Sequence, residues 1–441
     1  MPKESTQESQ STLLEQTVRD TGVFRCLECG KCTAICPISR YDHHFSPRRT
    51  VGRALMRHDE ALLTDDRLWT CLTCLHCTQV CPAGVAYSDL TLGVRTEARR
   101  LGTATVCMHG EAIHAWMRLM MDPALKQNRL SWLTSSLPQA PHSELEASSS
   151  ELSVFPEGDL RSSRGPRKSV PHLETRNDSD TLYFVGCAPY YGTLFEPLGV
   201  DGDGIARSTV QILNALGVKP QVLPDERCCG HDLLWEGDVQ GFRTLAGLNA
   251  ALIRKSGAKR IVTSCPECAR ALKVDYPAYG IRLDTEVVHL AQLLTYSEWP
   301  RPNNNGASHH RQPTLRITYH DPCRLGRHMG LYDPPRQVLE RLGLELIEMQ
   351  RHRHNALCCG TNGWTHCTIA NKAIQVDRLC EARATGAELL VAACIKCQIH
   401  LKCALQDRLL GHKIAIEVKD LATLVAERMT EGIQAEPGIF G

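Results

Sequence analysis

Several features that place a protein in a familiar functional class are scarce in this sequence of 441 residues. Aromatic residues make up 5 %, and 50 basic against 49 acidic side chains leave a net charge of +1, so the overall charge indicates neither a nucleic-acid groove nor an acidic partner. The longest uncharged apolar run, at residues 389–395, is far shorter than the roughly 20 residues that a membrane-spanning helix needs. No GxGxxG or Walker-type loop is present, so we expect the chain to bind neither a dinucleotide nor ATP.

Cysteine, in contrast, is abundant: the chain contains 22. In a short secreted protein such a number indicates disulfides, but here the cysteines fall in CxxC groups and adjacent pairs, which favour metal ligation. The N-terminal residues, MPKESTQESQST, are polar and contain no apolar core, so we expect no secretory signal peptide. Reduced thiols imply a cytoplasmic location. We expect any membrane contact, peripheral on the inner face, to come through a partner subunit.

Composition divides the chain into regions of different character. Residues 17–132 hold eight cysteines in helix-forming sequence, and we predict a mainly helical domain there. Residues 133–180 are rich in serine and proline and are expected to form a flexible linker. The remainder alternates short apolar strands with amphipathic helices, as α/β units do. The predicted fold class is therefore α+β, with a helical domain followed by α/β repeats.

The α/β region is internally duplicated, with one repeat at residues 181–299 and another at 314–428. The strand TLYFVGC of the first repeat is matched by LRITYHDPC in the second, and both repeats then contain a CCG triplet. The segments KRIVTSCPEC and EVVHLAQLL of the first repeat correspond to ELLVAACIKC and EVKDLATLV of the second. Matched features in one order indicate two copies of one unit, related by a pseudo-twofold axis.

The predicted helical domain contains the pattern CxxCxxCxxxCP twice. The cysteines of the first motif are Cys26, Cys29, Cys32 and Cys36, and those of the second are Cys71, Cys74, Cys77 and Cys81. In ferredoxins with this spacing the first three cysteines hold one [4Fe–4S] cluster and the fourth reaches the other cluster. We therefore predict two cubane clusters, one on Cys26, Cys29, Cys32 and Cys81 and one on Cys71, Cys74, Cys77 and Cys36. CxxC pairs also bind zinc, which is the alternative interpretation.

Between these motifs, SPRRTVGRALM from Ser46 predicts a helix with a proline in its first turn. Its basic residues, Arg48, Arg49 and Arg53, are candidates for raising a cluster potential or for docking a partner. Solvated charges on an exposed helix are the ordinary interpretation of the same residues.

Each α/β repeat carries five cysteines in the same order. The first repeat supplies Cys187, Cys228, Cys229, Cys265 and Cys268, and the second supplies Cys323, Cys358, Cys359, Cys394 and Cys397. Four of the ten (Cys187, Cys265, Cys323 and Cys394) end predicted strands, and in open α/β sheets ligands bind beyond the carboxyl ends of the strands. Five thiols are one more than a cubane cluster needs. Gly230 and Gly360 follow the adjacent pairs and are expected to allow a backbone turn that brings both cysteines to one site.

This arrangement resembles the CCG domain of the heterodisulfide reductase catalytic subunit. It is shared more loosely with the iron–sulfur subunits of glycolate, lactate and anaerobic glycerol-3-phosphate dehydrogenases. The segments CLECGKCTAICP and SPRR resemble the dicluster subunit of heterodisulfide reductase, here fused to the CCG subunit as in the membrane-linked form. The resemblance implies one non-cubane cluster on each group of five cysteines, both facing the substrate, with each cluster holding one sulfur as a disulfide breaks. Ordinary cubane clusters, or one repeat with only a structural role, remain alternatives.

Two functions therefore stay open, with a cluster-bearing scaffold or redox sensor as a third class. The first is a heterodisulfide-reductase-like oxidoreductase subunit that takes electrons from a flavoprotein, cytochrome or ferredoxin and acts on a small thiol or disulfide. The second is a relay subunit that passes electrons from a flavin-dependent dehydrogenase toward quinone. His231, His320 and His400 are candidate proton donors, although each is equally a candidate structural histidine. The remaining cysteines, which we predict to be small buried side chains, are Cys107, Cys367, Cys380 and Cys403.

Overall fold

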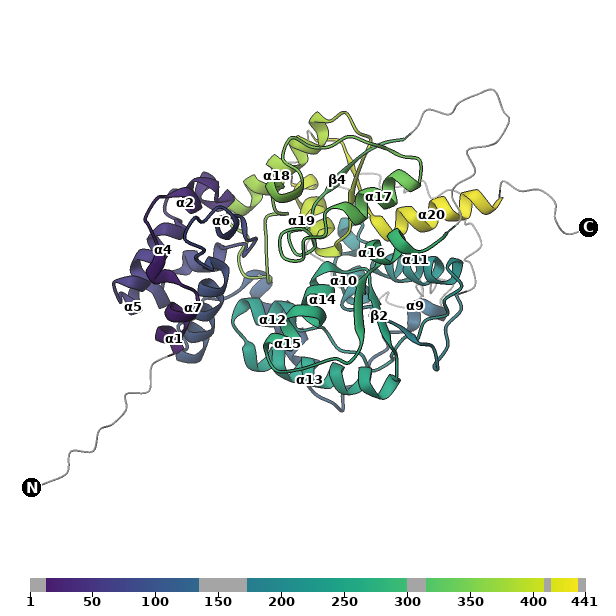
Figure 1. Ribbon diagram of the computed structural model, residues 1–441, viewed down its shortest axis with the longest axis horizontal. Helices are drawn as coiled ribbons and strands as arrows, with labels where there is room; N and C mark the ends of the chain where they lie inside the picture. The colour runs from purple at the N-terminus through teal and green to yellow at the C-terminus, as the bar shows by residue number, and fades with distance from the viewer. Residues whose placement is uncertain (1–12, 135–172, 300–314, 408–413, 435–441) are drawn as a thin grey trace, which may run out of the picture.

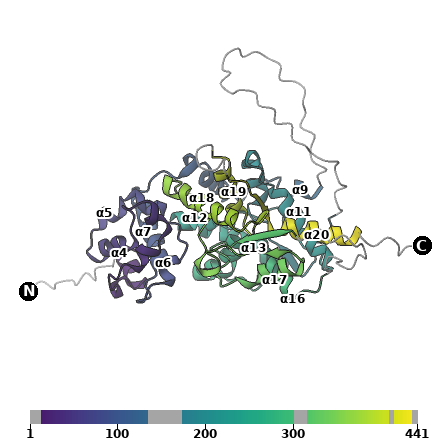
Figure 2. The same ribbon diagram turned by 90° about the horizontal axis from the view of Figure 1, so that it is seen from above.

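The computed structural model describes residues 13–134, 173–299, 315–407 and 414–434. Most of the predicted linker and the connector between the repeats lie outside these residues. A helical N-terminal domain forms one end of the molecule, and two α/β units packed against each other form the rest (Figure 1; Figure 2). No described helix is both long and apolar enough to cross a membrane.

The N-terminal domain is built from short helices around the two cysteine motifs. Its elements are α1 (Leu13–Asp20), η1 (Val23–Arg25), α2 (Lys31–Ile35), α3 (Pro37–Tyr41), α4 (Pro47–Leu55), α5 (Asp59–Leu63), η2 (Asp66–Thr70), α6 (His76–Gln79) and α7 (Tyr87–Leu101). Helix α4 is the helix predicted from SPRR, and the Ser46 hydroxyl caps it by accepting a hydrogen bond from the Arg49 amide. Helix α7 packs against α1 and buries Leu90, Val94 and Ala98 completely.

The first repeat is a parallel sheet of order β1-β2-β3, formed by β1 (Thr181–Tyr183), β2 (Arg260–Thr263) and β3 (Glu286–His289). Its strands are short and apolar because helices surround the sheet. The helical elements are α10 (Ala188–Leu194), η4 (Glu196–Leu198), α11 (Gly202–Ala215), α12 (His231–Glu236), α13 (Val239–Ser256), α14 (Pro266–Arg270), η5 (Ala271–Asp275), α15 (Tyr276–Ala278) and α16 (Leu290–Tyr296).

The second repeat is a parallel sheet of order β5-β4-β6-β7, formed by β4 (Arg316–His320), β5 (Glu345–Leu346), β6 (Leu389–Ala392) and β7 (Glu417–Asp420). Strand β5 corresponds in the first repeat to a single bridge between Leu182 and Gln221. The helical elements are α17 (Asp333–Arg341), η6 (Arg353–Asn355), α18 (Ile369–Ala384), α19 (Ile395–Leu405) and α20 (Leu421–Gln434).

The two repeats are related by a pseudo-twofold axis, as the packing of their helices shows. Helix α11 of the first repeat packs against α20 of the second, and the counterpart of α11, α17, packs against α16, the counterpart of α20. One apolar core runs through this contact and contains Val210, Leu213, Leu294, Leu339 and Val425. The predicted fold class, a helical domain followed by duplicated α/β units, is confirmed.

The segment after α7 packs on the repeats. It contains η3 (Met108–Glu111), α8 (Ala112–Leu119) and α9 (Ser131–Thr134). Met117 and Met120 lie in the core of the first repeat, and Trp132 lies edge-on to Tyr183 of β1 at 6.4 Å. Residues that the sequence grouped with the helical domain therefore share their core with the α/β units.

Candidate iron–sulfur centres

Two sulfur-lined hollows lie in the N-terminal domain. The first, which we call the first centre, has a volume of about 450 Å³ measured out to its open mouth, and its lining includes Cys26, Cys29, Cys32 and Cys81 and also Cys77. The other, the second centre, is lined by Cys71, Cys74, Cys77 and Cys36. The structure thus brings together the cysteines that the crossed ferredoxin pattern groups, although the ligand assignment itself stays a prediction.

The two motifs adopt the same local conformation. Glu28 and Gly30 in the first motif, and Thr73 and Leu75 at the same positions in the second, all have positive φ angles between 43° and 78°. These left-handed residues curl the loop so that the amides of Glu28 and Thr73 donate to the preceding Cys26 and Cys71 sulfurs, each at 3.4 Å. Such donors stabilise negative charge on sulfur, which suits thiolate ligands.

The centres differ in burial. Cys29 of the first centre is exposed, and Cys26, Cys32 and Cys81 are half-buried. In the second centre Cys71, Cys74 and Cys77 are buried. The first centre is therefore the one that an external redox group can approach.

The ten cysteines of the repeats converge into two groups that follow one order of contacts. In the first five-cysteine group, thiol contacts link in turn Cys187, Cys228, Cys229, Cys268 and Cys265. In the second five-cysteine group, the equivalent contacts link Cys323, Cys358, Cys359, Cys397 and Cys394, beginning with 3.9 Å between the sulfurs of Cys323 and Cys358. The predicted sets come together at the carboxyl ends of both sheets.

Glycines make room for these groups. Gly230 has a φ angle of +81°, and a Cβ there would lie 2.9 Å from the Phe242 side chain. Gly360 has a φ angle of +91°, and a Cβ there would lie 2.8 Å from the Asn371 carbonyl oxygen. Gly186 is a third such position, which the sequence analysis missed, because a Cβ there would lie 2.6 Å from the Cys268 sulfur.

In each group one cysteine of the adjacent pair is poised to lose its proton. The thiol of Cys187, and then that of Cys229, hydrogen-bond to Cys228 and hold its pKa well below the usual range. The Cys358 and Cys397 thiols lower the pKa of Cys359 to about 6 in the same way. Each group thus places thiol donors around one sulfur of its adjacent pair, which favours the thiolate there.

An ion pair between equivalent residues joins the two groups. Glu267 lies in the CxxC turn of the first group, Lys396 occupies the same place in the second, and their side chains meet at 2.8 Å. Lys396 also contacts Asp232, which follows the first CCG, and His231 lies 3.2 Å from the same carboxylate. Although burial pushes the pKa of Asp232 upward, Lys396 and His231 more than offset it and hold that pKa below its usual range.

The second group, in turn, adjoins the second centre. Arg327 donates to the Cys74 carbonyl at 2.5 Å and to the Ala356 carbonyl at 2.7 Å, which ties the two sites together. Arg324 donates to the Thr73 carbonyl at 2.8 Å and to Asn362 at 2.7 Å. Cys71, Cys74 and Cys77 share one apolar cluster with the cysteines of the second group.

The candidate proton donors occupy different surroundings. His231 lines the hollow of the first group and accepts a hydrogen bond from Arg324 at 2.8 Å. Burial, followed by repulsion from Arg378, holds the pKa of His320 well below its usual value, and burial does the same for His400. Burial thus favours the neutral form of His320 and of His400.

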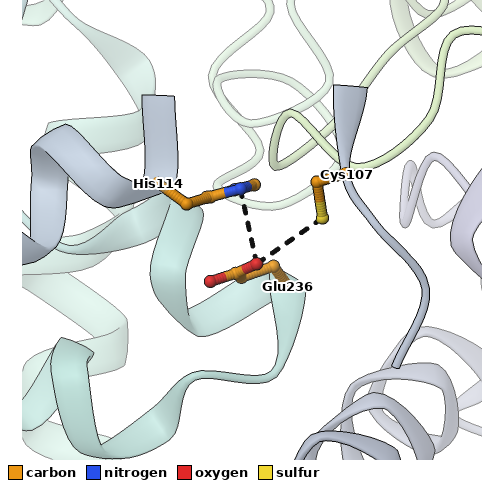
Figure 3. Close-up of side chains that lie close together, drawn as sticks. All are labelled: Cys107, His114 and Glu236. Atoms are coloured by element: carbon orange, nitrogen blue, oxygen red, sulfur yellow. Dashed lines mark hydrogen bonds and ion pairs between the residues drawn. The ribbon is translucent and has the colours of Figure 1, made fainter. Parts of the chain in front are cut away.

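The remaining cysteines differ from the prediction in part. Cys107 is buried, Cys367 and Cys403 are half-buried, and Cys380 is exposed on α18, because it lies on the outer face of that helix. Cys107 faces Glu236 at 3.6 Å, and His114 lies 3.4 Å from the same carboxylate (Figure 3). Arg99 and Arg118 also bind Glu236, so this cluster is a charged junction between α7, α8 and α12.

These donor sets fit iron–sulfur clusters. All the cysteines are free thiols, and the two N-terminal hollows and the hollow of the first five-cysteine group are lined by sulfur and by mostly apolar side chains. Five converging sulfurs in each repeat exceed the four ligands that a structural zinc ion takes.

Comparison with known proteins agrees with this chemistry. Residues 22–85 match the 4Fe-4S dicluster domain, and residues 181–273 and 317–402 match the CCG cysteine-rich domain. One subunit of the dihydromethanophenazine:CoB–CoM heterodisulfide reductase of Methanosarcina mazei is 34 % identical over 273 residues, which cover 59 % of this chain and 61 % of that protein.

More distant relatives have other names. The EtfAB:quinone oxidoreductase of Syntrophomonas wolfei is 25 % identical over 353 residues, covering 77 % of this chain and 48 % of its own length. The probable iron–sulfur-binding oxidoreductase FadF of Bacillus subtilis is 25 % identical over 411 residues, which cover 85 % of this chain and 56 % of FadF. The matches thus span between about half and three fifths of these relatives. The resemblance to the CCG and dicluster subunits of heterodisulfide reductase, which the sequence indicated, is confirmed.

Proposed function

We propose that this chain, which carries a 4Fe-4S dicluster domain and two CCG domains, is the iron–sulfur subunit of a heterodisulfide-reductase-like complex that reduces or forms a disulfide. Its relatives include a heterodisulfide reductase subunit, and the thiol-rich sites suit sulfur chemistry. The partner would be a flavoprotein, cytochrome or ferredoxin subunit. Any membrane contact, on the cytoplasmic face, would come through that partner.

One observation carries the proposal: the two five-cysteine groups meet across the Glu267–Lys396 ion pair. This pair fixes the CxxC turns of both repeats against each other. The Cys265 and Cys394 thiols of these turns lie close enough to interact electrostatically. A disulfide placed between the groups would meet one sulfur-rich site at each of its atoms. Asp232, Glu267 and His231 line this region and would orient polar parts of a substrate and hold protons near the departing sulfur.

Burial and contacts support a linear order of sites. The first centre is open to solvent, the second is buried, and the second five-cysteine group adjoins the second centre through Arg327. Bound at these sites, [4Fe–4S] clusters would supply single-electron transfer. A disulfide takes two electrons, which two neighbouring sites together would provide.

Relay from a flavin-dependent dehydrogenase to quinone is the second candidate function. Similarity to EtfAB:quinone oxidoreductase over 77 % of this chain favours it. In that case the five-cysteine groups would conduct electrons and meet no sulfur substrate.

Spectroscopy of anaerobically purified protein tests these functions. Disulfide chemistry predicts about sixteen iron atoms per chain, four for each of four clusters. It also predicts a thiol-dependent paramagnetic signal on oxidation that disappears in Cys229→Ser and in Cys359→Ser. Cys380→Ser is the matched control, because that cysteine is exposed and belongs to no group.

Two other outcomes would change the conclusion. About eight iron atoms, with free thiols in both repeats, would leave only the two N-terminal clusters. Full iron content with a signal indifferent to every thiol, together with rapid reduction by a flavoprotein, would establish the relay.

A further inference from the structure

Large apolar side chains are exposed beside the first centre. Phe24, two residues before Cys26, is 65 % exposed, and Leu27, directly after it, is 69 % exposed. Leu27 lines the mouth of the hollow itself, next to the exposed Cys29. Apolar residues this exposed and this close to a redox site are typical of a surface that a partner covers.

Three cations, against one exposed carboxylate residue, Glu28, lie at the same mouth. Lys31 and Arg48 line the hollow, and Arg48 donates to the Glu28 carbonyl at 3.4 Å. Arg25 reaches across to the Gly84 carbonyl at 3.4 Å, on the loop that follows Cys81. Within the described parts of the chain, none of the three cations forms an ion pair with a carboxylate.

Several cations elsewhere in the N-terminal domain are paired with carboxylates, whereas the Arg49 guanidinium donates to the His44 carbonyl. Arg53 binds Asp65, Arg57 binds Glu15 and Asp59, and Arg100 binds Glu97. The overall net charge of +1 hid this local difference, which is why the sequence indicated no acidic partner. A net positive charge around apolar side chains is complementary to an acidic surface with an apolar middle.

We propose that Phe24, Arg25, Leu27, Lys31 and Arg48, the first-centre rim, dock an acidic redox protein that exchanges electrons through the first centre. The inference rests on the proposed iron–sulfur function and adds where the partner binds and what charge it carries. The N-terminal domain projects at one end of the molecule, away from the bulk of the repeats (Figure 1; Figure 2). A protein fits better than a membrane, because the apolar residues surround an exposed cluster ligand, Cys29, and lipid accepts no electron.

Stopped-flow reduction of the full-length anaerobic protein tests the rim. The probes are a reduced acidic ferredoxin as donor and the basic horse heart cytochrome c as acceptor. At low salt the double variant Arg25→Glu/Lys31→Glu should react about 10- to 100-fold more slowly with the ferredoxin and faster with the cytochrome. Added salt should slow the wild-type reaction with ferredoxin and remove the difference. The control, Arg254→Glu/Lys255→Glu at the exposed end of α13, should behave as wild type.

Binding provides an independent readout. Titration calorimetry with oxidised ferredoxin should show binding that weakens at least tenfold in Arg25→Glu/Lys31→Glu and also in Leu27→Ser, which leaves the charges intact. Iron content should stay unchanged in these variants, which shows that the clusters are intact, whereas wild-type protein without iron would count against the proposed function and not against the rim. Equal rates and equal affinities for the rim and control variants would overturn the docking proposal. The proposal would also be overturned if the rim variants lost binding to phosphatidylglycerol vesicles but kept the wild-type rate and affinity with ferredoxin.

Discussion

The two repeats hold their cysteines in one geometry but surround them with opposite charge. Beside the first five-cysteine group lie carboxylates, whereas arginines and a lysine lie beside the second. The equivalent positions, with the residue of the first repeat given before that of the second, are Ala188 and Arg324, Tyr191 and Arg327, Asp232 and Asn362, and Glu267 and Lys396. The sulfur framework thus survived duplication while its neighbours diverged.

This divergence gives each repeat a different task. The arginines of the second repeat donate to carbonyl groups of the second centre and hold the N-terminal domain in place. The carboxylates of the first repeat receive Lys396 from the second. A symmetric pair of repeats would have neither a side that binds the N-terminal domain nor an ion pair across its axis.

Replacing Lys396 should have the largest effect on this asymmetry. Lys396→Met leaves Asp232 and Glu267 buried without their cation, and breaking a buried ion pair in this way costs about 3–5 kcal/mol. We expect a much lower thermal unfolding midpoint in anaerobic scans at one fixed rate. Glu267→Gln is the matched control and should cost less, because Lys396 keeps Asp232. If both variants lost the same stability, the loss would come from the Glu267–Lys396 ion pair and not from carboxylates left buried without a cation.

Arg324→Ala should weaken the attachment of the N-terminal domain to the second repeat. The guanidinium packs 4.3 Å from the Trp235 ring and donates to Thr73, Asn362 and His231, all without a carboxylate. Leaving these buried acceptors unpaired costs about 2–4 kcal/mol. Limited proteolysis should then release the N-terminal domain faster. Arg254→Ala, at an exposed helix end, should leave the cleavage rate unchanged.

Patterns local in sequence predicted much of this molecule. Strand and helix order, the capped helix at Ser46 and the duplication follow from periodicity, turn residues and repeated cysteines, and the structure has them all. The grouping of the cysteines also followed from spacing, because each CxxC or CCG turn is a short segment. The ligands of each cluster stay a prediction.

Contacts between distant segments could not be predicted in the same way. Arg324 and Arg327 resemble ordinary surface charges until the second repeat is docked on the N-terminal domain. Glu267 and Lys396 lie 2.8 Å apart only because the pseudo-twofold axis brings two CxxC turns together. Charge balance over the whole chain likewise concealed the unpaired cations at the first-centre rim.

Glu226 distinguishes the repeats in their response to pH. Its counterpart is Ala356, and the Glu226 carboxylate accepts from Arg129 and from the Val185 and Gly186 amides. Burial outweighs these contacts and raises the pKa of Glu226 from 4.5 to about 7. A raised carboxyl pKa means that the folded state binds the proton more tightly, so the contribution of Glu226 to stability falls as the pH rises from about 4.5 through 7.

Glu226→Gln should reduce that fall by about 2 kcal/mol between pH 5.5 and 7.5. Glu236 and Asp420, whose pKa values burial also raises to about 7, keep their contributions. Buried histidines such as His114 and His289, whose pKa values burial lowers to about 4, contribute with the opposite sign, so the test is the difference in slope between variant and wild type. Thermal midpoints across this range measure the slope. An unchanged slope would show that Arg129 keeps Glu226 ionised in the folded protein.

The smallest effect is expected at the junction between the N-terminal domain and the first repeat, the cluster of Figure 3. Glu236→Gln removes the negative charge that Arg99 and Arg118 share, but these arginines keep Glu111 and Asp238 as partners. Gln keeps an acceptor oxygen and the two arginines are partly exposed, so the loss should be about 1 kcal/mol, well below that of Arg324→Ala. If Glu236→Gln instead released the N-terminal domain as readily as Arg324→Ala, the two repeats would hold that domain equally, and the asymmetry argued from the arginines would be wrong.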